Sequence, residues 1–267
     1  MSLSLLPAEI QELIIDSVAA VPPPDRRHAM SICSQVCKFW HSSSLRHTFY
    51  DVDLPRHLKS RQDVNILRLM EANPEIARCI KSISIAFPWR GDTSTYDDDE
   101  FEKVCQAVSK SASQLAFYRA VPDLRSRPLV QKGLSLLLGS PSLSNLSFFS
   151  AFKSSMLESA SQSVGVLNFN HVKDVVLDHE DSVKLSRSLQ KIKFWGSQTV
   201  ISTMQQTPGL SQIFERTQHF HIIVDPGSVR SAALWNHDLI WGNCTSLDLT
   251  FGYLFGEPFL CFQLSHI

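Results

Sequence analysis

The segment Ile83-Ser84-Ile85 sets a pattern that returns as Leu115-Ala116-Phe117 and again as Leu146-Ser147-Phe148. In each segment two apolar residues flank one small residue, and another apolar residue stands three positions before the first of them. This alternation predicts a short strand with one buried face. The first apolar residues, at 83, 115 and 146, are 32 and 31 residues apart, which leaves room for a helix between consecutive strands.

The pattern extends in both directions along the chain. One earlier copy and four later ones complete the series: Val52-Asp53-Leu54, Val175-Val176-Leu177, Ile192-Lys193-Phe194, Phe220-His221-Ile222 and Leu247-Asp248-Leu249. The first apolar residues of the eight copies, at 52, 83, 115, 146, 175, 192, 220 and 247, are separated by 31, 32, 31, 29, 17, 28 and 27 residues. A strand that recurs at such intervals resembles a leucine-rich repeat, whose usual length is about 20–29 residues. An ordinary layered α/β domain is the alternative.

Helices are expected in most of the intervals between these strands. Apolar residues at helical spacing predict them over 63–72, 95–111, 130–138, 154–163, 198–206 and 229–240. The acidic run Asp97-Asp98-Asp99-Glu100 is typical of a helix start, where the helix dipole favours negative charge. The step of 17 residues is too short for a full helix, so residues 178–188 are predicted to form a loop or a single turn. The predicted fold class is therefore α/β, with an irregular leucine-rich-repeat-like solenoid over residues 51–267.

The first 50 residues have a different pattern, which is typical of helices. One predicted helix starts near Pro7 and ends at the proline run 22–24, and a second extends from about residue 27 to 43. Together they carry more large apolar side chains than a two-helix hairpin can bury. Part of this surface must therefore contact either the repeats, as a cap on the solenoid, or another protein.

Three segments of this region resemble the F-box: Leu6-Pro7-Ala8-Glu9-Ile10, Leu13-Ile14 and Ile32-Cys33-Ser34-Gln35-Val36-Cys37-Lys38-Phe39-Trp40, of which Val36–Trp40 is the most specific part. That family has Leu-Pro-x-Glu before an apolar residue, then two apolar helix positions, and later Val-Cys, a basic residue, any residue and Trp. The resemblance covers about residues 4–50. The overall sequence pattern of the chain is similar to that of the F-box-like families of mushroom-forming fungi. The chain departs from the pattern at 21–30, where a longer, proline-rich and basic link replaces the short turn of many family members.

The resemblance implies a division into an F-box-like helical domain at 1–50 and the repeat domain at 51–267. It also implies a function as the substrate-recognition adaptor of a cullin–RING ubiquitin ligase, with a Skp-type adaptor and a target protein as partners. A helix can dock into a partner's groove through apolar anchors at helical spacing. The residues expected to bind the adaptor are Leu6, Pro7, Ile10, Leu13, Ile14, Val36, Cys37 and Trp40. On this interpretation Trp40→Ala would abolish co-purification with the adaptor.

The residues between the apolar strand positions are expected to face outward on the open side of the sheet. This set includes Asp178, Ile223, Asp248 and Thr250, and the residues chosen as the target-binding site are Tyr118, Phe149, Lys193, Trp195 and His221. Exposed aromatic residues are frequent in protein interfaces. A slip of one residue in register would reverse every assignment.

Composition narrows the classes of function. Twenty-five basic and 26 acidic residues give a net charge of −1, which does not favour a nucleic-acid-binding protein. No apolar run reaches the roughly 20 residues that span a bilayer, and the N-terminus does not resemble a signal peptide. The six cysteines are expected to be free thiols, with Cys33 and Cys37 as neighbours on one helix. We therefore expect a cytoplasmic or nuclear protein, or one present in both compartments, that binds no membrane.

No catalytic motif such as GxSxG, HExxH, GxGxxG or a P-loop occurs, so we expect no enzyme activity and no cofactor. His219 and His221 share a strand face, but no third metal ligand is evident. A repeat scaffold without a ligase role is the main alternative function, and a hydrolase hidden in an irregular α/β domain is a third. The apolar tail Phe259-Leu260-Cys261-Phe262-Gln263-Leu264 differs from the polar cap that a solenoid requires, so the C-terminus is expected to be truncated or atypical.

Overall fold

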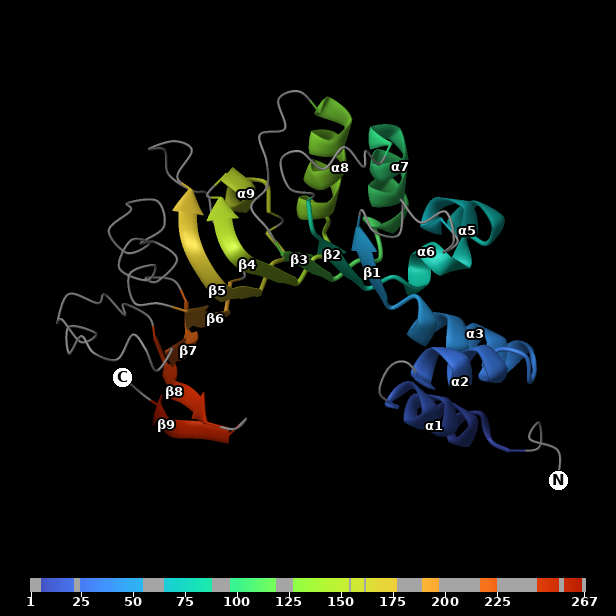
Figure 1. The fold of residues 1–267 in the computed structure, drawn as a ribbon, viewed down its shortest axis with the longest axis horizontal. Coiled ribbons are helices and arrows are strands. Elements are labelled where there is room, and N and C mark those ends of the chain that lie inside the picture. The colour runs from blue at the N-terminus through green and yellow to red at the C-terminus, as the bar shows by residue number, and fades with distance from the viewer. Residues whose placement is uncertain are drawn as a thin grey trace.

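The protein consists of three N-terminal helices followed by a curved sheet with helices on one face (Figure 1). In the computed structural model the described residues are 6–21, 25–54, 65–87, 97–118, 127–153, 155–160, 162–176, 189–196, 217–224, 244–254 and 257–265. The predicted segments 178–188, 198–206 and 229–240 lie outside these ranges, and so does Asp178.

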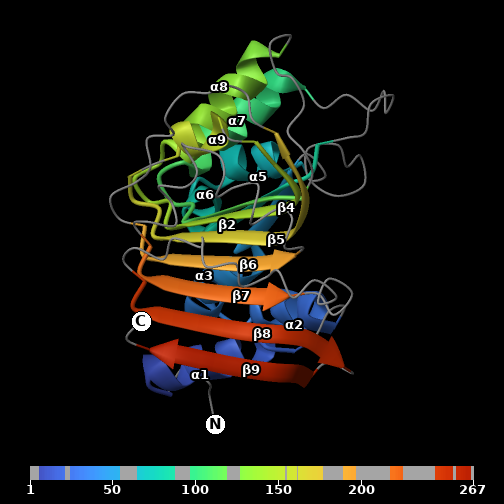
Figure 2. The same cartoon turned by 90° about the vertical axis from the view of Figure 1, so that its left-hand side faces the viewer.

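Nine strands form one sheet in which the spatial order follows the chain order from β1 to β9. The strands β1 to β8 are parallel, and β9 runs antiparallel to β8, as the stacked strands in Figure 2 show. Their bounds are β1 Asp51–Leu54, β2 Ser82–Ile85, β3 Gln114–Phe117, β4 Asn145–Lys153, β5 Val166–Val176, β6 Lys191–Gly196, β7 His219–Val224, β8 Ser246–Leu254 and β9 Glu257–Ser265. The open parallel sheet of eight strands, built from successive repeats, is the arrangement of a leucine-rich-repeat-like solenoid.

One backbone carbonyl per repeat joins each repeat to the next. It lies two residues before the first buried strand residue, and it accepts hydrogen bonds from backbone N–H groups of the following repeat at 2.8–3.1 Å. The acceptors are the carbonyls of Tyr50, Lys81, Ser113, Ser144, Gly165, Gln190 and Gln218. Six of these seven carbonyls accept two such bonds. Serine and threonine side chains reinforce the ladder, since the Ser144 and Thr245 hydroxyls each donate to a carbonyl of the preceding repeat at 3.1 Å.

This ladder corrects the position of the fifth repeat. Leu167 is in register with Leu146 on one side and with Ile192 on the other, whereas Val175 pairs with Phe152 farther along the same strands. The prediction that Val175 begins the fifth strand core is therefore wrong. With 167 in place of 175, the irregular steps of 29 and 17 residues become 21 (146 to 167) and 25 (167 to 192).

The helices lie in the intervals between the strands, largely as predicted. Their bounds are α5 Ile66–Ala72, α6 Glu75–Cys79, α7 Asp98–Val108, α8 Pro128–Leu138 and α9 Ser155–Glu158. Helix α7 begins as expected, because the Asp97 carboxylate accepts a hydrogen bond from the Asp99 N–H at 2.9 Å. The helix predicted at 154–163 is shortened to the four residues of α9, because the interval from 146 to 167 is the shortest in the series.

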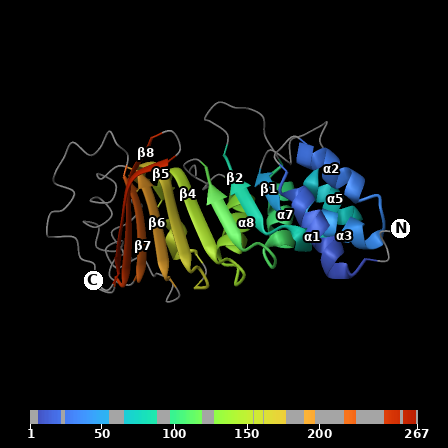
Figure 3. The same cartoon turned by 90° about the horizontal axis from the view of Figure 1, so that it is seen from below.

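The sheet curves because its two sides have different spacing. Neighbouring strands lie about 4.8 Å apart, whereas packed helices need roughly 8–10 Å between their axes. The helices therefore occupy the outer side of the arc, where α7 and α8 lie above the strands in Figure 1. Seen from below in Figure 3, the opposite face of the sheet is turned to the viewer and α7 and α8 lie behind it.

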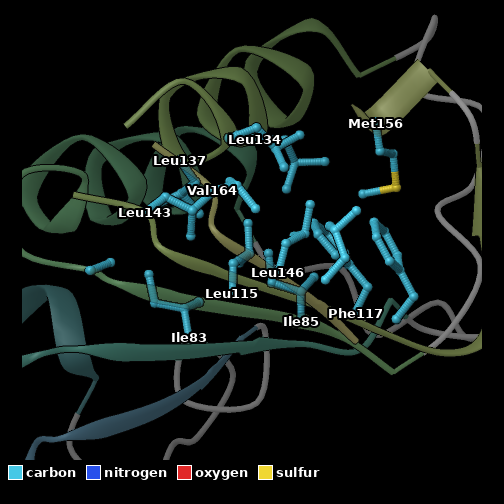
Figure 4. Packing of buried hydrophobic residues seen from close by; sticks show 14 of the residues in the cluster. Ile83, Ile85, Leu115, Phe117, Leu134, Leu137, Leu143, Leu146, Met156 and Val164 are labelled. Carbon is cyan, nitrogen blue, oxygen red and sulfur yellow. The ribbon is translucent and has the colours of Figure 1, made fainter. Parts of the chain in front are cut away.

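On each of the strands β1 to β7, two apolar residues are buried on the same side of the sheet and form the core. Four phenylalanines at the second of these positions stack across consecutive strands, with ring centroids 5.7, 5.8 and 5.9 Å apart: Phe117, Phe148, Phe169 and Phe194. Leucines of α8 cover this layer, and Figure 4 shows Leu134 and Leu137 above Leu115 and Leu146. Register and burial thus agree on which strand face is internal.

The N-terminal helices are α1 Ala8–Ala19, α2 Asp25–Cys33 and α3 Lys38–Thr48. The single helix predicted over 27–43 is interrupted, because residues 34–36 form a turn and Cys37 is extended at φ −163°. Cys33 and Cys37 are therefore not neighbours on one helix, as the spacing had suggested. The three helices enclose a small core of their own, made of Ile15, Met30, Cys33 and Trp40.

We predict that substitution of two adjacent phenylalanines lowers stability by very different amounts. Phe148 is fully buried in the stack, so Phe148→Ala should lower the free energy of unfolding by about 3–5 kcal/mol. Phe149→Ala, on the open face, should cost about 1 kcal/mol or less. Urea unfolding followed by circular dichroism measures both, and equal losses would contradict the register.

Candidate protein-binding surfaces

Exposed apolar side chains are concentrated at the N-terminal end of the chain. Ten large apolar residues are exposed among the described residues, and six of them fall between 6 and 36: Leu6, Ile10, Leu13, Val21, Ile32 and Val36. Exposed apolar groups scattered singly are normal, whereas their concentration in one small unit is typical of an interaction surface. The helical unit therefore exposes apolar surface although it has an internal core.

A shallow groove on α1 belongs to this surface. It is lined by Ile10, Leu13, Ile14, Ser17, Val18 and Val21. These residues recur at the three- and four-residue spacing of one helix face. The groove is shallow and mainly apolar, which suits contact with another apolar surface.

The predicted adaptor-binding residues divide into two groups. Leu6, Pro7, Ile10, Leu13, Val36 and Cys37 are exposed, and Ile14 is half-buried. Trp40 is only 5% exposed, and its indole N–H donates to the Gln11 side-chain oxygen at 2.8 Å. Trp40 thus serves the interior of the helical unit and is not accessible to a partner. Val21 and Ile32 are also exposed, although neither was among the predicted adaptor-binding residues.

The second surface is the open face of the sheet, and its register is now determined. The residue that follows the first buried residue of each strand faces this side, which places Ser147, Asn168, Lys193, His221 and Asp248 in one row across β4 to β8. A parallel row two residues farther along contains Phe149, Asn170, Trp195 and Ile223, and Thr250 pairs with Ile223 in the strand register. Lys193, Trp195, His221 and Phe149 therefore occupy the rows that were predicted.

Corrected register adds residues that the sequence pattern missed. The position assigned to Asp178 belongs instead to Asn170, and the position between the two apolar residues, assigned to Val176, belongs to Asn168. The Asn168 side-chain amide donates to the Ser147 hydroxyl at 3.0 Å, which links two neighbouring strands on this face. The motif Val164, Leu167, Phe169 carries the same apolar spacing as the other repeats and is the signal that locates them.

Aromatic rings are paired along the second row. Tyr118 is 44% exposed and stacks on Phe149, with ring centroids 4.4 Å apart and planes 13° apart. The rings of His171 and Trp195 are 4.2 Å apart at 45°. Stacking fixes these side chains, so a partner that contacts them loses little additional side-chain entropy.

The two strands in the middle of the aromatic row are irregular. The register of β4 against β5 shifts between Phe149 and Ala151, and that of β5 against β6 shifts between Asn170 and Val172. The residues at these shifts, Ser150 and His171, have positive φ angles of 69° and 49°. Such β-bulges re-aim side chains, and here they place the His171 ring against Trp195.

The imidazole of His221 lies in a mixed electrostatic environment. Burial lowers its pKa below the ordinary value of 6.5, Asp248 on β8 opposes this shift, and Lys191 and Lys193 on β6 add to it. The neutral imidazole is therefore favoured in the folded protein. Among the described residues, no group of His, Cys, Asp and Glu side chains is arranged to hold a metal ion.

A polar pocket lies where the helical unit meets the first repeat. Glu12, Asp16, Arg46, His47, Glu75, Arg78 and Lys81 are among the residues that line it. His47 contacts Asp16 at 2.9 Å and Arg78 contacts Glu75 at 2.8 Å. Opposite charges are balanced here, so the pocket selects neither an anion nor a cation.

The described cysteines are free thiols, of which Cys37 is exposed and Cys33, Cys105 and Cys244 are buried. Burial raises the pKa of the Cys105 thiol, so it is the unreactive neutral form that is present. No helix within the described ranges is long and apolar enough to cross a bilayer.

We predict that the His221 imidazole titrates below pH 6.5 in the folded protein and that Asp248→Asn lowers its pKa further, because the carboxylate that favours the charged form is removed. Two-dimensional NMR of the imidazole resonances measures both values. Between the folded and unfolded pKa values the unfolded chain binds more protons, so this residue's contribution to stability decreases as the pH falls through that window. An upward shift in Asp248→Asn would contradict the assignment.

No family model matches the chain, and no curated protein matches it. Among solved structures the chain is similar to the leucine-rich-repeat-containing protein LegL7 from Legionella pneumophila, with 12% sequence identity and a TM-score of 0.36 over 84% of this chain and 87% of that one. The strand register and the carbonyl ladder identify a leucine-rich-repeat-like solenoid, and the F-box resemblance of residues 4–50 stays a prediction.

Proposed function

We propose that this protein is a substrate-recognition adaptor of a cullin–RING ubiquitin ligase, which holds a Skp-type adaptor through its N-terminal helices and a target protein through the open face of its repeats. The proposal includes no catalytic residue. Its physical effect is proximity, because a ligase held at one site and a target held at another react at a raised effective concentration.

The observation that carries the proposal is the apolar surface of the helical unit. This unit has a closed core of its own and still exposes Leu6, Ile10, Leu13 and Val36. These exposed residues belong to the segments that resemble the F-box. A groove in a partner can take up such a helix through the Ile10 and Leu13 side chains.

The alternative is a repeat scaffold that binds a protein without any ligase. The stacked rings on the open face support protein binding in either case, because aromatic residues are enriched in interfaces. The two functions differ only in whether the helical unit binds a Skp-type adaptor.

We predict that Leu13→Asp in combination with Ile10→Asp abolishes co-purification with a purified Skp-type adaptor. Both side chains are exposed, at 60% and 43%, so the charges leave the fold intact while preventing apolar docking. The matched control is Leu136→Asp, which adds a charge at an exposed leucine of α8. Retained adaptor binding in a folded double variant would contradict the assignment of Ile10 and Leu13 as anchors, whereas an unmodified protein that does not bind the adaptor would contradict the ligase role.

Trp40→Ala does not test docking. Trp40 is buried and hydrogen-bonded, so its removal is expected to destabilise the helical unit by about 3–5 kcal/mol and to weaken any function of that unit indirectly.

We also predict that the adaptor protects Cys37 from alkylation. Of the five cysteines whose burial is described, Cys37 is exposed, Cys79 is half-buried and the other three are buried, and Cys37 belongs to the F-box-like segment. A maleimide should label it in the free protein and should label it several-fold more slowly in the complex, as peptide mass spectrometry measures. Equal rates with and without bound adaptor would place the contact elsewhere.

A further inference from the structure

The charges on the open face of the sheet are unevenly distributed. In the two outward rows nearest the strand centres, β2 to β5 carry only uncharged residues: Ser82, Ser84, Gln114, Ala116, Asn145, Ser147, Val166 and Asn168. The next strand, β6, carries two cations at these positions, Lys191 and Lys193. Acidic residues occupy these rows on both sides of the series, as Asp51 and Asp53 on β1 and as Asp248 on β8, and the intervening β7 carries His219 and His221.

The two lysines are available for an external anion. Lys193 is exposed and Lys191 is half-exposed. Neither forms an ion pair within the described part of the chain. Two aromatic pairs lie in the row two residues farther along: Trp195, on β6 itself, contacts the His171 ring, and the pair Tyr118–Phe149 lies two to three strands away. Tyr118 is exposed whereas Trp195 is half-buried, so the Tyr118–Phe149 pair is the more accessible one.

From this arrangement we propose that the open face binds an extended segment of a partner protein that combines an acidic residue with an aromatic or other large apolar residue three or four positions away. The inference deepens the proposed function, and it rests on that function's assignment of the open face as the target site.

The spacing follows from sheet geometry. Two strand intervals from β4 to β6 measure roughly 10 Å, and two residues along a strand measure roughly 7 Å, so the Phe149 ring and the Lys193 position are roughly 12 Å apart. An extended chain covers this distance in three or four residues at about 3.3–3.6 Å each. The uncharged side chains in between provide hydrogen-bond donors and acceptors for a peptide backbone.

Charge complementarity also determines the placement of the segment. Its acidic residue is attracted to Lys191 and Lys193 and is repelled by Asp51 and Asp53 at one end of the sheet and by Asp248 on β8, so it is directed to the β6 position and toward the uncharged strands β2 to β5. The large apolar side chain is placed over Tyr118 and Phe149, whose rings are already held in position by stacking. A basic segment in the same position would be repelled by the two lysines.

The test is selection of a random dodecapeptide library against the full-length protein. Enriched peptides are expected to contain Asp or Glu and, three or four positions away, an aromatic or large aliphatic residue. Lys193→Glu and Tyr118→Ala should each weaken binding of a selected peptide by about tenfold or more in fluorescence anisotropy. Lys110→Glu, which makes the same charge change at an exposed lysine outside the sheet, should leave binding unchanged. Binding should also weaken as salt is raised.

The inference is overturned if no peptide is enriched, if the enriched peptides lack an acidic residue, or if a single-stranded oligonucleotide binds the same face in their place. Its failure is separable from failure of the ligase role, because adaptor binding is measured on the same preparations. Adaptor binding without peptide selection refutes only the target chemistry. Peptide selection in a protein that does not bind the adaptor leaves a scaffold with the proposed specificity.

Discussion

The carbonyl ladder that runs between consecutive repeats determines most of what this protein presents to its surroundings. Each acceptor carbonyl receives N–H groups from the next repeat, so the two strands are locked in one register. A shift by one residue would break these bonds and would exchange the buried and exposed faces of the strand. The phenylalanine stack inside and the aromatic row outside are both consequences of this register, since Phe148 and Phe149 are adjacent in the chain and lie on opposite faces.

The apolar spacing in the sequence predicted this register correctly for the repeats whose strand contains a single apolar-polar-apolar segment. At β2, β3 and β4 the apolar spacing alone places the buried residues, and the structure confirms them. The prediction of the register from apolar spacing failed at β5, and the reason is physical. This strand is eleven residues long and contains a bulge, so Leu167 and Val175 both belong to extended segments of one element. The β-branched cluster around Val175 has the stronger strand propensity, whereas the Leu167 segment has the contacts to the neighbouring repeats.

The helical unit was less predictable. The break between α2 and α3 contains neither Gly nor Pro, so no local signal marks it, and it arises where the chain folds back to close the core around Ile15 and Met30. The same closure accounts for Trp40, which the motif suggested as a contact residue and which the packing places inside. The pattern of apolar residues in the sequence does not distinguish side chains that are buried in the protein's own core from side chains that are exposed to a partner. The exposed fraction of each side chain makes that distinction, and it leaves Ile10 and Leu13 outside.

The two surfaces are connected by a rigid element. The helices α1 to α3 lie beyond β1, at the end of the sheet opposite β9, and the aromatic row and the lysines lie on β3 to β6 (Figure 1). Five strand intervals from β1 to β6 amount to roughly 24 Å. Because each interval is set by hydrogen bonds and buried apolar contacts, this distance varies little, unlike that across a flexible linker. In the proposed function, a spacer of fixed length raises the effective concentration of the target only for a ligase whose active site reaches across this span. The number of repeats between the two binding sites therefore contributes to the specificity for the target.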